Sequence, residues 1–202
     1  KSVKAVSAYS EASSFSKPSL MKNRTESKVY EYDAKGNEME RMSYDDSGKI
    51  KSKRISKYDA KGNEVERANY DGSGKINSQK TSKYDAKGNR LEEVEYDFEG
   101  KQKRKLIYKF DANGKKTEKL TYSSNENLQS TTKYDKKGNE VEIRNHDADG
   151  EVTGRSTSKY ADHGRFCENC NTTHWNKLEW VGYDESGKIT GRSINKYNDK
   201  GK

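Results

Sequence analysis

The feature that most constrains the fold is a turn cassette, Tyr-Asp-x-x-Gly-Asn/Lys, that recurs along the chain. From Tyr32 to Tyr122 its copies follow one another at spacings that alternate between 12 and 14 residues. Matching or weaker copies begin at Tyr32, Tyr44, Tyr58, Tyr70, Tyr84, Tyr96, Phe110, Tyr122, Tyr134, His146, Tyr160, Tyr183 and Tyr197. The repeating unit therefore holds two strands and two turns in about 26 residues, which is typical of a meander of short strands.

Each cassette has the chemistry of a hairpin turn. In the copy at residues 59–62, the Asp59 carboxylate can accept hydrogen bonds from the following backbone amides, and Gly62 can adopt a left-handed conformation. These residues predict a type I turn that closes on a glycine bulge. Copies at Asp111 and Asp147 resemble fragments of calcium loops, but they keep the turn register and lack a bidentate Glu at loop position 12. We therefore expect structural turns there as well.

The strands between the turns alternate in charge. Short strands such as residues 63–70 carry Glu64 and Glu66, whereas long strands such as residues 49–58 carry Lys53 and Arg54. Opposite charges on neighbouring strands contribute about 0.2–1 kcal/mol per pair and disfavour pairing of like strands. This alternation is expected to fix the order of the meander.

Apolar residues are too sparse for a conventional two-layer core. Only 28% of residues are hydrophobic and 37% are charged. The apolar positions of short and long strands have opposite parity, so neither face of a sheet can be wholly apolar. We expect an all-β fold: an extended antiparallel meander of tandem β-hairpin repeats, largely a single layer that twists or curls.

The repeat domain is expected to cover residues 25–202, with residues 1–24 as a flexible leader or an irregular cap over the first edge. One spacing, from Tyr160 to Tyr183, is 23 residues, and realignment places a loop insertion at residues 165–175.

The chain begins at Lys1, so removal of a signal peptide is one reading, and export to the cell surface, the periplasm or the medium is expected. No stretch reaches the roughly 18 apolar residues of a membrane-spanning helix. Continuation of the natural chain past Lys202 is left open.

The insertion holds a Cys-His constellation. With two flanking histidines it reads His163-x3-Cys167-x2-Cys170-x3-His174. A disulfide between Cys167 and Cys170, or two free thiols, ranks ahead of a zinc site, because four ligands from one short loop would be cramped. No cofactor is expected, with zinc as the alternative, and the two cysteines are silent about the compartment.

Aromatic residues are the candidates for ligand contact. Tyr residues recur before the turns and are expected to line both rims of the sheet, where most would pack over their own turns. Around the insertion we assign Phe166, Trp175, Trp180 and Tyr183 as candidate ligand-binding residues, because exposed rings can stack on sugars. The formal charge of +8 favours an acidic glycan. Nucleic acid ranks below it, since no known nucleic-acid fold or arginine-rich stripe is recognised.

The cassettes at Tyr44 and Tyr58 resemble the YD repeats of bacterial RHS-type proteins and, more loosely, bacterial MORN-type variant repeats. The resemblance covers the chain from about residue 25 and implies an exported or surface-associated repeat protein; some members of the YD group bind carbohydrate.

No nucleophile, phosphate-binding or paired-carboxylate arrangement stands apart from the repeat, so no enzymatic activity is expected. We expect a bacterial surface module that binds a glycan or a host or cell-surface ligand. The alternatives are a structural or spacer element that contacts protein through its sheet edges, and a metal-binding loop protein. Ligand, organism, oligomeric state and sheet curvature are not fixed by the sequence.

Overall fold

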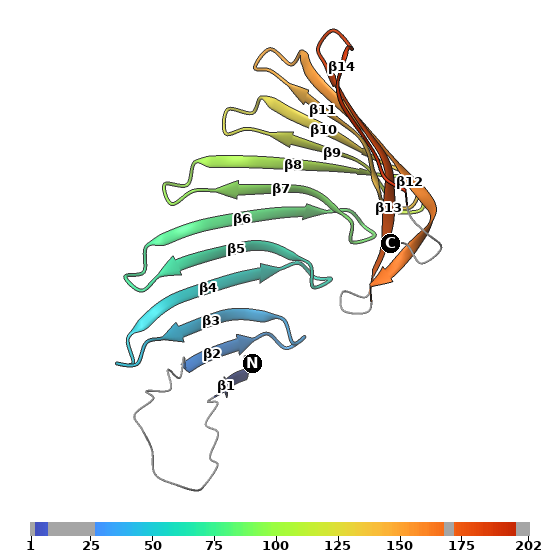
Figure 1. Ribbon diagram of the computed structural model, residues 1–202. Helices are drawn as coiled ribbons and strands as arrows, with labels where there is room; N and C mark the ends of the chain where they lie inside the picture. The colour runs from blue at the N-terminus through green and yellow to red at the C-terminus, as the bar shows by residue number, and fades with distance from the viewer. Residues whose placement is uncertain (1–2, 8–26, 168–171, 197–202) are drawn as a thin grey trace, which may run out of the picture. The chain divides into compact units, whose positions relative to one another are not determined.

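The computed structural model describes residues 3–7, 27–167 and 172–196, and of residues 3–7, 27, 162–167 and 172–175 it describes the backbone alone. Every regular element in these ranges is a β-strand (Figure 1). None of the described residues forms a helix long and apolar enough to span a bilayer. The strands are β1 Val3–Ser7, β2 Ser27–Tyr32, β3 Glu38–Tyr44, β4 Ile50–Tyr58, β5 Glu64–Asp71, β6 Ile76–Tyr84, β7 Arg90–Tyr96, β8 Gln102–Phe110, β9 Lys116–Tyr122, β10 Leu128–Tyr134, β11 Glu140–His146, β12 Val152–Cys167, β13 Thr172–Asp184 and β14 Ile189–Ile194.

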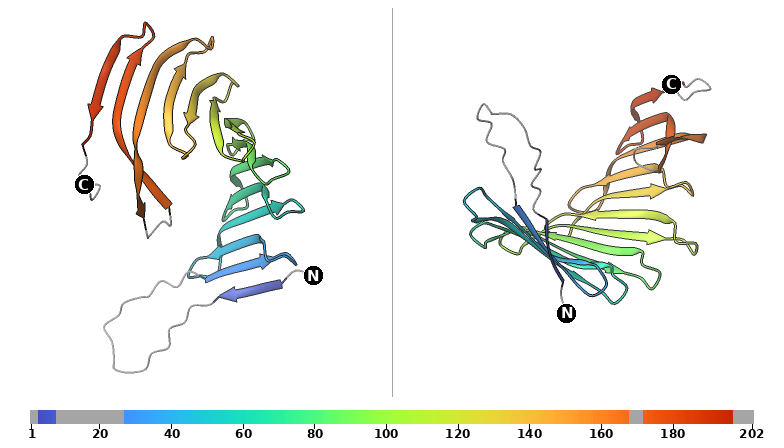
Figure 2. Two further views of the ribbon diagram at one scale, coloured as in Figure 1. Left: turned by 90° about the vertical axis from the view of Figure 1, so that its right-hand side faces the viewer. Right: turned by 90° about the horizontal axis from the view of Figure 1, so that it is seen from below.

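The strand order in the sheet is the order in the sequence, from β1 to β14. Neighbouring strands are antiparallel, and those from β2 to β12 and from β13 to β14 are joined by tight turns, as the two further views in Figure 2 also show. The chain divides into two units, residues 1–88 with 93–103 and residues 89–92 with 104–202. The predicted all-β antiparallel meander is confirmed. We call the two parts unit 1 and unit 2.

The predicted turn chemistry is confirmed in atomic detail. Asp59 Oδ1 accepts hydrogen bonds from the amides of Lys61 and Asn63, both at 2.9 Å, and the Gly62 amide donates to the Asp59 carbonyl at 3.1 Å. Gly62 has a φ of 88°, and the register shifts by one residue at Tyr58, as a glycine bulge requires. These hydrogen bonds, above all the one from the Asn63 side chain, lower the pKa of Asp59.

Turns on one rim also contact the next turn along that rim. The Asn37 side chain lies beside Gly62 of the following repeat, where a methyl group on the glycine would be 3.5 Å from Asn37 Oδ1. The ammonium groups of Lys35 and Lys61 donate to the carbonyls of Ala60 and Ala86, one repeat further on. Each turn is thus held by its neighbour as well as by its own Asp.

Charge alternation between strands produces the predicted cross-strand ion pairs. Directly opposite residues beside the turns pair as Lys57 with Glu66 at 2.8 Å and as Lys159 with Glu179 at 2.7 Å. The same pair occurs at Lys109 with Glu118 and at Lys133 with Glu142. Lysine and glutamate therefore mark the register of the hairpins, as the sequence predicts.

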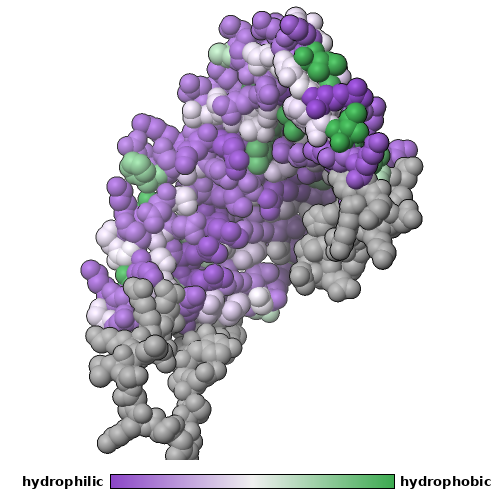
Figure 3. Space-filling model, in the orientation of Figure 1, coloured by the Kyte–Doolittle hydropathy of each residue, from purple (hydrophilic) through white to green (hydrophobic). Residues whose placement is uncertain are grey.

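The described residues contain no core of large apolar side chains. The buried hydrophobic residues are Ala68, Val94, Leu106 and Val181, and none of the larger side chains is fully buried. Equally buried are the polar residues Ser56, Ser82, Glu93 and Thr132. The face drawn in Figure 3 is mostly hydrophilic, with small separate hydrophobic areas. These observations agree with the predicted single layer, in which hydrogen bonds and ion pairs replace apolar packing.

Two sequence boundaries need correction. Residues 3–7, expected in a flexible leader or an irregular cap, form strand β1 and pair with β2 from Val3 opposite Tyr32 to Ser7 opposite Lys28. The insertion at residues 165–175 is also more regular than a loop. Backbone pairs from Gly164 opposite Trp175 to Cys167 opposite Thr172 lengthen the β12–β13 hairpin on both sides of residues 168–171, which lie outside the described part.

Candidate functional site

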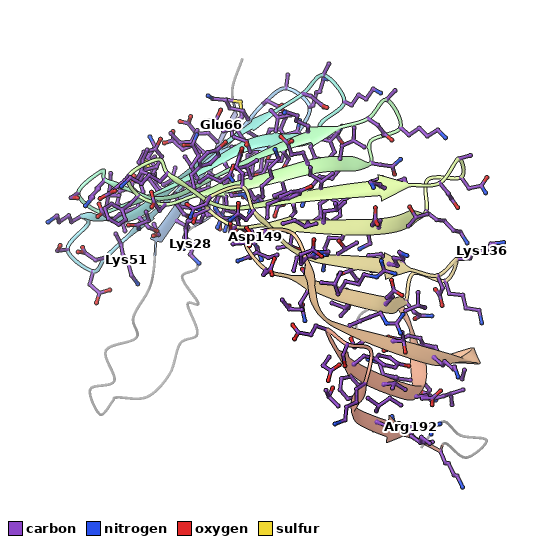
Figure 4. All side chains as sticks on the ribbon, turned by 90° about the horizontal axis from the view of Figure 1, so that it is seen from above. Lys28, Lys51, Glu66, Lys136, Asp149 and Arg192 are labelled. Atoms are coloured by element: carbon purple, nitrogen blue, oxygen red, sulfur yellow. The ribbon has the colours of Figure 1, made fainter. Side chains whose placement is uncertain are left out.

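A polar hollow of about 340 Å³ lies on unit 1, and its lining is strongly basic. We call it the cationic hollow. Its lining residues are Lys28, Arg41, Ser43, Lys51, Ser52, Lys53, Arg54, Asn69, Tyr70 and Asn77. Five of these ten side chains are cationic and none is a carboxylate. In Figure 4 the labelled Lys28 and Lys51 lie on one side of the unit 1 strands and Glu66 on the other.

Strand register brings these residues together. One ladder row runs Tyr30, Arg41, Arg54, Asn69 across strands β2 to β5, each residue directly opposite the next. Directly opposite residues in an antiparallel sheet point to the same face. The next row on this face contains Lys28 of β2, which is directly opposite Ser43 of β3. The Ser43 hydroxyl in turn shares a hydrogen bond of 2.7 Å with the hydroxyl of Ser52, its partner in β4.

The two arginines of this row differ in their partners. Arg41 forms an ion pair with Glu38 at 2.9 Å and lies over the Tyr30 ring at 5.3 Å. The hydrogen bond that Arg41 donates to Glu38 raises the pKa of Arg41. Arg54 instead donates through Nε to the neutral Asn69 side chain at 3.0 Å. Among the described residues it forms no ion pair with a carboxylate.

Like charges that face each other across a ladder destabilise a sheet, so the Arg41–Arg54 pair needs a reason. Two other pairs of this kind have carboxylates for both members. Arg67 opposite Lys80 is balanced by Glu64 at 2.7 Å and Glu93 at 3.3 Å. Arg144 opposite Arg155 shares Glu142, at 2.8 and 4.0 Å. The Arg41–Arg54 pair is balanced on one side only, which leaves the hollow positive and suited to an anion.

The sequence-predicted candidates around Trp180 do not form one site. Trp180 lies opposite Ser158 and Ser193, whereas Tyr183 lies opposite Arg155, and their odd separation along a regular β13 strand puts them on opposite faces. The Arg155 guanidinium covers the Tyr183 ring at 4.5 Å.

The Trp180 indole lies against two glycines on its own face of the sheet. A methyl group at Gly182 would be 2.8 Å from Trp180 Cη2, and one at Gly191 would be 3.2 Å from Cζ3. Because glycine lacks a Cβ atom, the ring can approach the backbone at both positions. Trp180 is therefore fixed in place by the small residues beneath it.

The remaining candidates lie outside the described side chains. Phe166, Trp175, Cys167, His163 and His174 belong to the β12–β13 extension, of which only the backbone is described. Cys170 lies outside the described residues altogether. Elsewhere in the described part, no group of three or more His, Cys, Asp or Glu residues is placed to hold a metal ion. Disulfide, free thiols and zinc all stay open as predictions.

The rim tyrosines serve the sheet itself. The hydroxyls of Tyr58, Tyr84 and Tyr160 donate to backbone carbonyls of Glu38, Glu64 and Glu140 on the adjacent strand, at 2.9 to 3.1 Å. Tyr134 donates instead to the Glu140 carboxylate at 2.9 Å, and burial together with this carboxylate raises its pKa. The first three hydroxyls connect a hairpin to the preceding one, whereas the Tyr134 hydroxyl stays within the β10–β11 hairpin. That most rim tyrosines pack over their own turns stays a prediction.

Sequence reasoning missed the cationic hollow because it sought function where the repeat is interrupted. The hollow lies inside the most regular part of the chain, and its basic residues read as ordinary members of long and short strands. A signal was present: Lys28, Arg41 and Arg54 are spaced by 13 residues each, half of the 26-residue unit.

Comparisons with known proteins leave the chain without a family. No protein-family model matches it, and no curated protein matches it. Among solved structures, a porin-like protein from Bacteroides uniformis is 10% identical with a TM-score of 0.39, over 90% of this chain and 87% of that one. The TcdB2-TccC3-Cdc42 structure is 14% identical with a TM-score of 0.28, over 84% of this chain and 11% of that one. A TarM structure is 18% identical with a TM-score of 0.28, over 53% and 21%. Likenesses this weak carry no argument, so the chain stands as a β-hairpin repeat protein, and membership of the YD group stays a prediction.

Proposed function

We propose that this protein is a non-catalytic, exported module that binds an acidic glycan at the cationic hollow. The observation that carries the proposal is the lining of the hollow, which holds five cations and no carboxylate; of these cations Arg41 pairs with Glu38 and Lys53 with Glu40, outside the lining, whereas Arg54 has a neutral partner. Charged hydrogen bonds to carboxylate or sulfate groups are stronger than neutral ones, and guanidinium groups bind such anions in a two-pronged manner. Arg54, which donates to a neutral amide rather than to a carboxylate, is the strongest candidate for the anion contact.

Polar neutral groups between the cations support a sugar rather than a bare anion. The Ser43 and Ser52 hydroxyls and the Asn69 amide lie in the same rows as the arginines. Hydroxyl and amide groups can exchange hydrogen bonds with the hydroxyls of a sugar ring. Acid groups would be bound by the cations, and ring hydroxyls by these side chains.

Export and surface location are part of the proposal and rest on the sequence resemblance to YD repeats. A sheet held by turns, ladders and ion pairs suits a display surface, because both faces can carry polar side chains. Absence of enzymatic activity is proposed on the same footing, since the turn aspartates and strand glutamates discussed above serve turns and ion pairs.

The test is binding of immobilised glycans that carry carboxylate, sulfate or no charge, with wild-type protein and Arg54→Ser. We expect binding of one charged class at low salt, weakening as salt rises, and a loss of about threefold to tenfold in Arg54→Ser. Lys103→Ser is the matched control, because it removes one exposed charge from β8 in unit 1, outside the hollow. Absence of binding to every charged glycan, or equal losses in both variants, would refute the proposal.

A second candidate is a structural element that contacts other proteins through its edge. Strand β14 is the last strand of the sheet, and Ile189 and Ile194 on it are 56% and 59% exposed. Apolar residues on an edge strand favour pairing with another chain. Light scattering at increasing concentration would show association of the wild type and its loss in Ile194→Lys if this candidate holds.

Metal content of protein purified under reducing conditions tests the remaining alternative, a zinc-binding loop.

A further inference from the structure

The spacing of basic residues that marks the hollow continues beyond it. Lys28, Arg41, Arg54, Arg67 and Lys80 follow one another at intervals of 13 residues, one on each of strands β2 to β6. All five belong to unit 1. The next position in the series is Glu93, which ends the run. We call these five residues the cationic stripe.

Register places the whole stripe on one face. Arg41 is directly opposite Arg54, and Arg67 is directly opposite Lys80. The other two steps are diagonal, because Arg54 is opposite Asn69, two residues from Arg67, and Arg41 is opposite Tyr30, two residues from Lys28. Direct neighbours in a ladder have Cβ atoms about 5 Å apart and diagonal ones about 7 Å apart. The stripe therefore runs across the strands with one cation on each.

Carboxylates border the stripe without neutralising it evenly. Arg41 and Arg67 each pair with the first residue of their own strand, Glu38 and Glu64, at 2.9 and 2.7 Å. A guanidinium has five N–H donors, so one carboxylate leaves donors available for a ligand. The Arg41 and Arg67 side chains also stay 39% and 34% exposed.

The far end of the stripe has a boundary. Glu93 is 7% exposed and forms an ion pair with Lys80 at 3.3 Å. A buried carboxylate at this place repels an anion that extends further in the same direction. Within the stripe, Lys80 is thus paired with a buried carboxylate, whereas Arg54 bonds to the neutral Asn69 side chain.

From this geometry we propose, resting on the proposed function above, that the ligand is a linear acidic polysaccharide that lies across strands β2 to β6 along the cationic stripe. A single sulfate or carboxylate can contact only two neighbouring cations of the row. A polymer with acid groups at regular intervals contacts all five, and each added contact increases the affinity. Arg54 anchors the chain, and Arg67 and Lys80 bind its extension.

A polysaccharide fits better than a single-stranded nucleic acid. Proteins that bind single strands stack the bases on exposed aromatic rings. The row side chains beside the cations are instead hydroxyls and amides, such as Ser52, Asn69 and Ser78, together with the turn carboxylate Asp71 opposite Ser52. The aromatic ring in these rows, Tyr30, is covered by Arg41 and stacks on Tyr32 at 6.3 Å.

The experiment measures the affinity of the full chain for oligogalacturonates of increasing length, and for heparin-derived oligosaccharides if the carboxylate series does not bind. We expect the affinity of one series to rise with length until the chain can contact all five cations and then to level off. Arg67→Ser should weaken binding of the long oligomers by threefold or more and leave the shortest binding oligomers unchanged. Arg54→Ser should weaken binding at all lengths, and the control Lys103→Ser at none.

The outcomes separate the two proposals. If neither series binds at any length, the proposed function itself fails. If binding occurs but is independent of length, or if Arg67→Ser behaves as Lys103→Ser does, the hollow binds an isolated acid group and the polymer proposal is wrong. If an oligothymidylate of equal charge competes as well as the best polysaccharide, the polysaccharide assignment is wrong. Circular dichroism of each variant ensures that losses are not due to unfolding.

Discussion

Unit 1 and unit 2 have the same kinds of turns, ladders and lysine–glutamate pairs, but they differ at one ladder position. This position lies three residues after the start of a short strand, as Arg41 does in β3. In unit 1 this position holds the stripe arginines Arg41 and Arg67, after Glu38 and Glu64, and then Glu93. In unit 2 it holds Lys119 and Ile143, after Lys116 and Glu140, and Trp180 takes the corresponding place in β13. The same backbone thus presents only charged side chains at this position in one unit and a mixture of cationic, apolar and aromatic ones in the other.

This difference shows how a repeat can be functional without an interruption. Turn residues are constrained, because Asp, Gly and the following residue make the hydrogen bonds that close each hairpin. The mid-strand position on the face of the cationic stripe takes no part in closing the turn, so its side chain can vary from repeat to repeat. A run of equal residues there, as in unit 1, is a better sign of a binding surface than a deviation from the cassette.

The largest expected effect is acid unfolding, and it should reach both units. Hydrogen bonds, chiefly from Asn37 and Asn63, lower the pKa of Asp33 and Asp59 in unit 1. In unit 2 the bond from Ser186 lowers the pKa of Asp184, and bonds from Lys159 and Arg192 lower that of Glu179. A folded pKa below the unfolded one, about 3.9 for Asp, means stability that is present above that pH and is lost as the pH falls through the folded pKa.

Thermal unfolding followed from pH 7 to pH 2 should therefore show a nearly constant Tm down to about pH 5 and a progressive fall below about pH 4. Hydrogen exchange of the turn amides would report each unit separately. If the turns of one unit keep their protection in acid while the other unfolds, the shared turn chemistry is not what stabilises both.

The next effect is specific to unit 1. At Gly72 a methyl group would collide with the Ile50 carbonyl oxygen, whereas the same place two cassettes earlier, in the cassette at Tyr44, holds Asp46. Backbone cannot move aside as a flexible side chain can, so Gly72→Ala should lower the free energy of unfolding by about 1–3 kcal/mol. Urea unfolding measures the loss, and Asp46→Ala is the control, expected to change stability by less than about 0.5 kcal/mol. Equal behaviour of the two variants would contradict the close approach of β5 to β4.

A smaller effect tests the aromatic position of unit 2. Gly182→Ala would place its methyl group 2.8 Å from Trp180 Cη2, so the indole must leave the backbone. We expect a change in Trp180 fluorescence, measured in a Trp175→Phe background, and a stability loss of about 0.5–1.5 kcal/mol from the displaced rotamer. Gly191→Ala, with its contact at 3.2 Å, should shift the emission less. Unchanged emission in Gly182→Ala would mean that the ring does not rest on the glycines.

The sequence could predict the features that depend on residues close to one another along the chain. Asp59 and Gly62 determine their own turn, and Lys57 and Glu66 lie close enough along the chain for their pairing to follow from the turn. The cationic hollow could not be found in this way, because Arg41 and Arg54 become neighbours only through the register of β3 on β4. Strand β1 carries no cassette, and the weak cassette at Tyr160 predicted a turn where β12 instead continues to Cys167, so neither pairing was anticipated.

The smallest effect concerns the first hairpin of unit 1, where the pairing rule fails. Glu31 is directly opposite Glu40, at the place where four other hairpins have Lys opposite Glu. Glu40 also forms an ion pair with Lys53 at 3.0 Å, and Glu31 is directly opposite Lys4 of β1. Glu31→Lys would therefore exchange the like-charge pair with Glu40 for an attractive one, but it would also place a lysine directly opposite Lys4. Because these two changes have opposite signs, we expect a net change in stability of less than about 0.5 kcal/mol, and a smaller one at high salt. Lys57→Glu removes an attractive pair in the next hairpin and should lose about 0.2–1 kcal/mol. Urea unfolding of both variants decides the matter: a loss in Glu31→Lys as large as that in Lys57→Glu would show that the repulsion between Glu31 and Glu40 costs the first hairpin nothing.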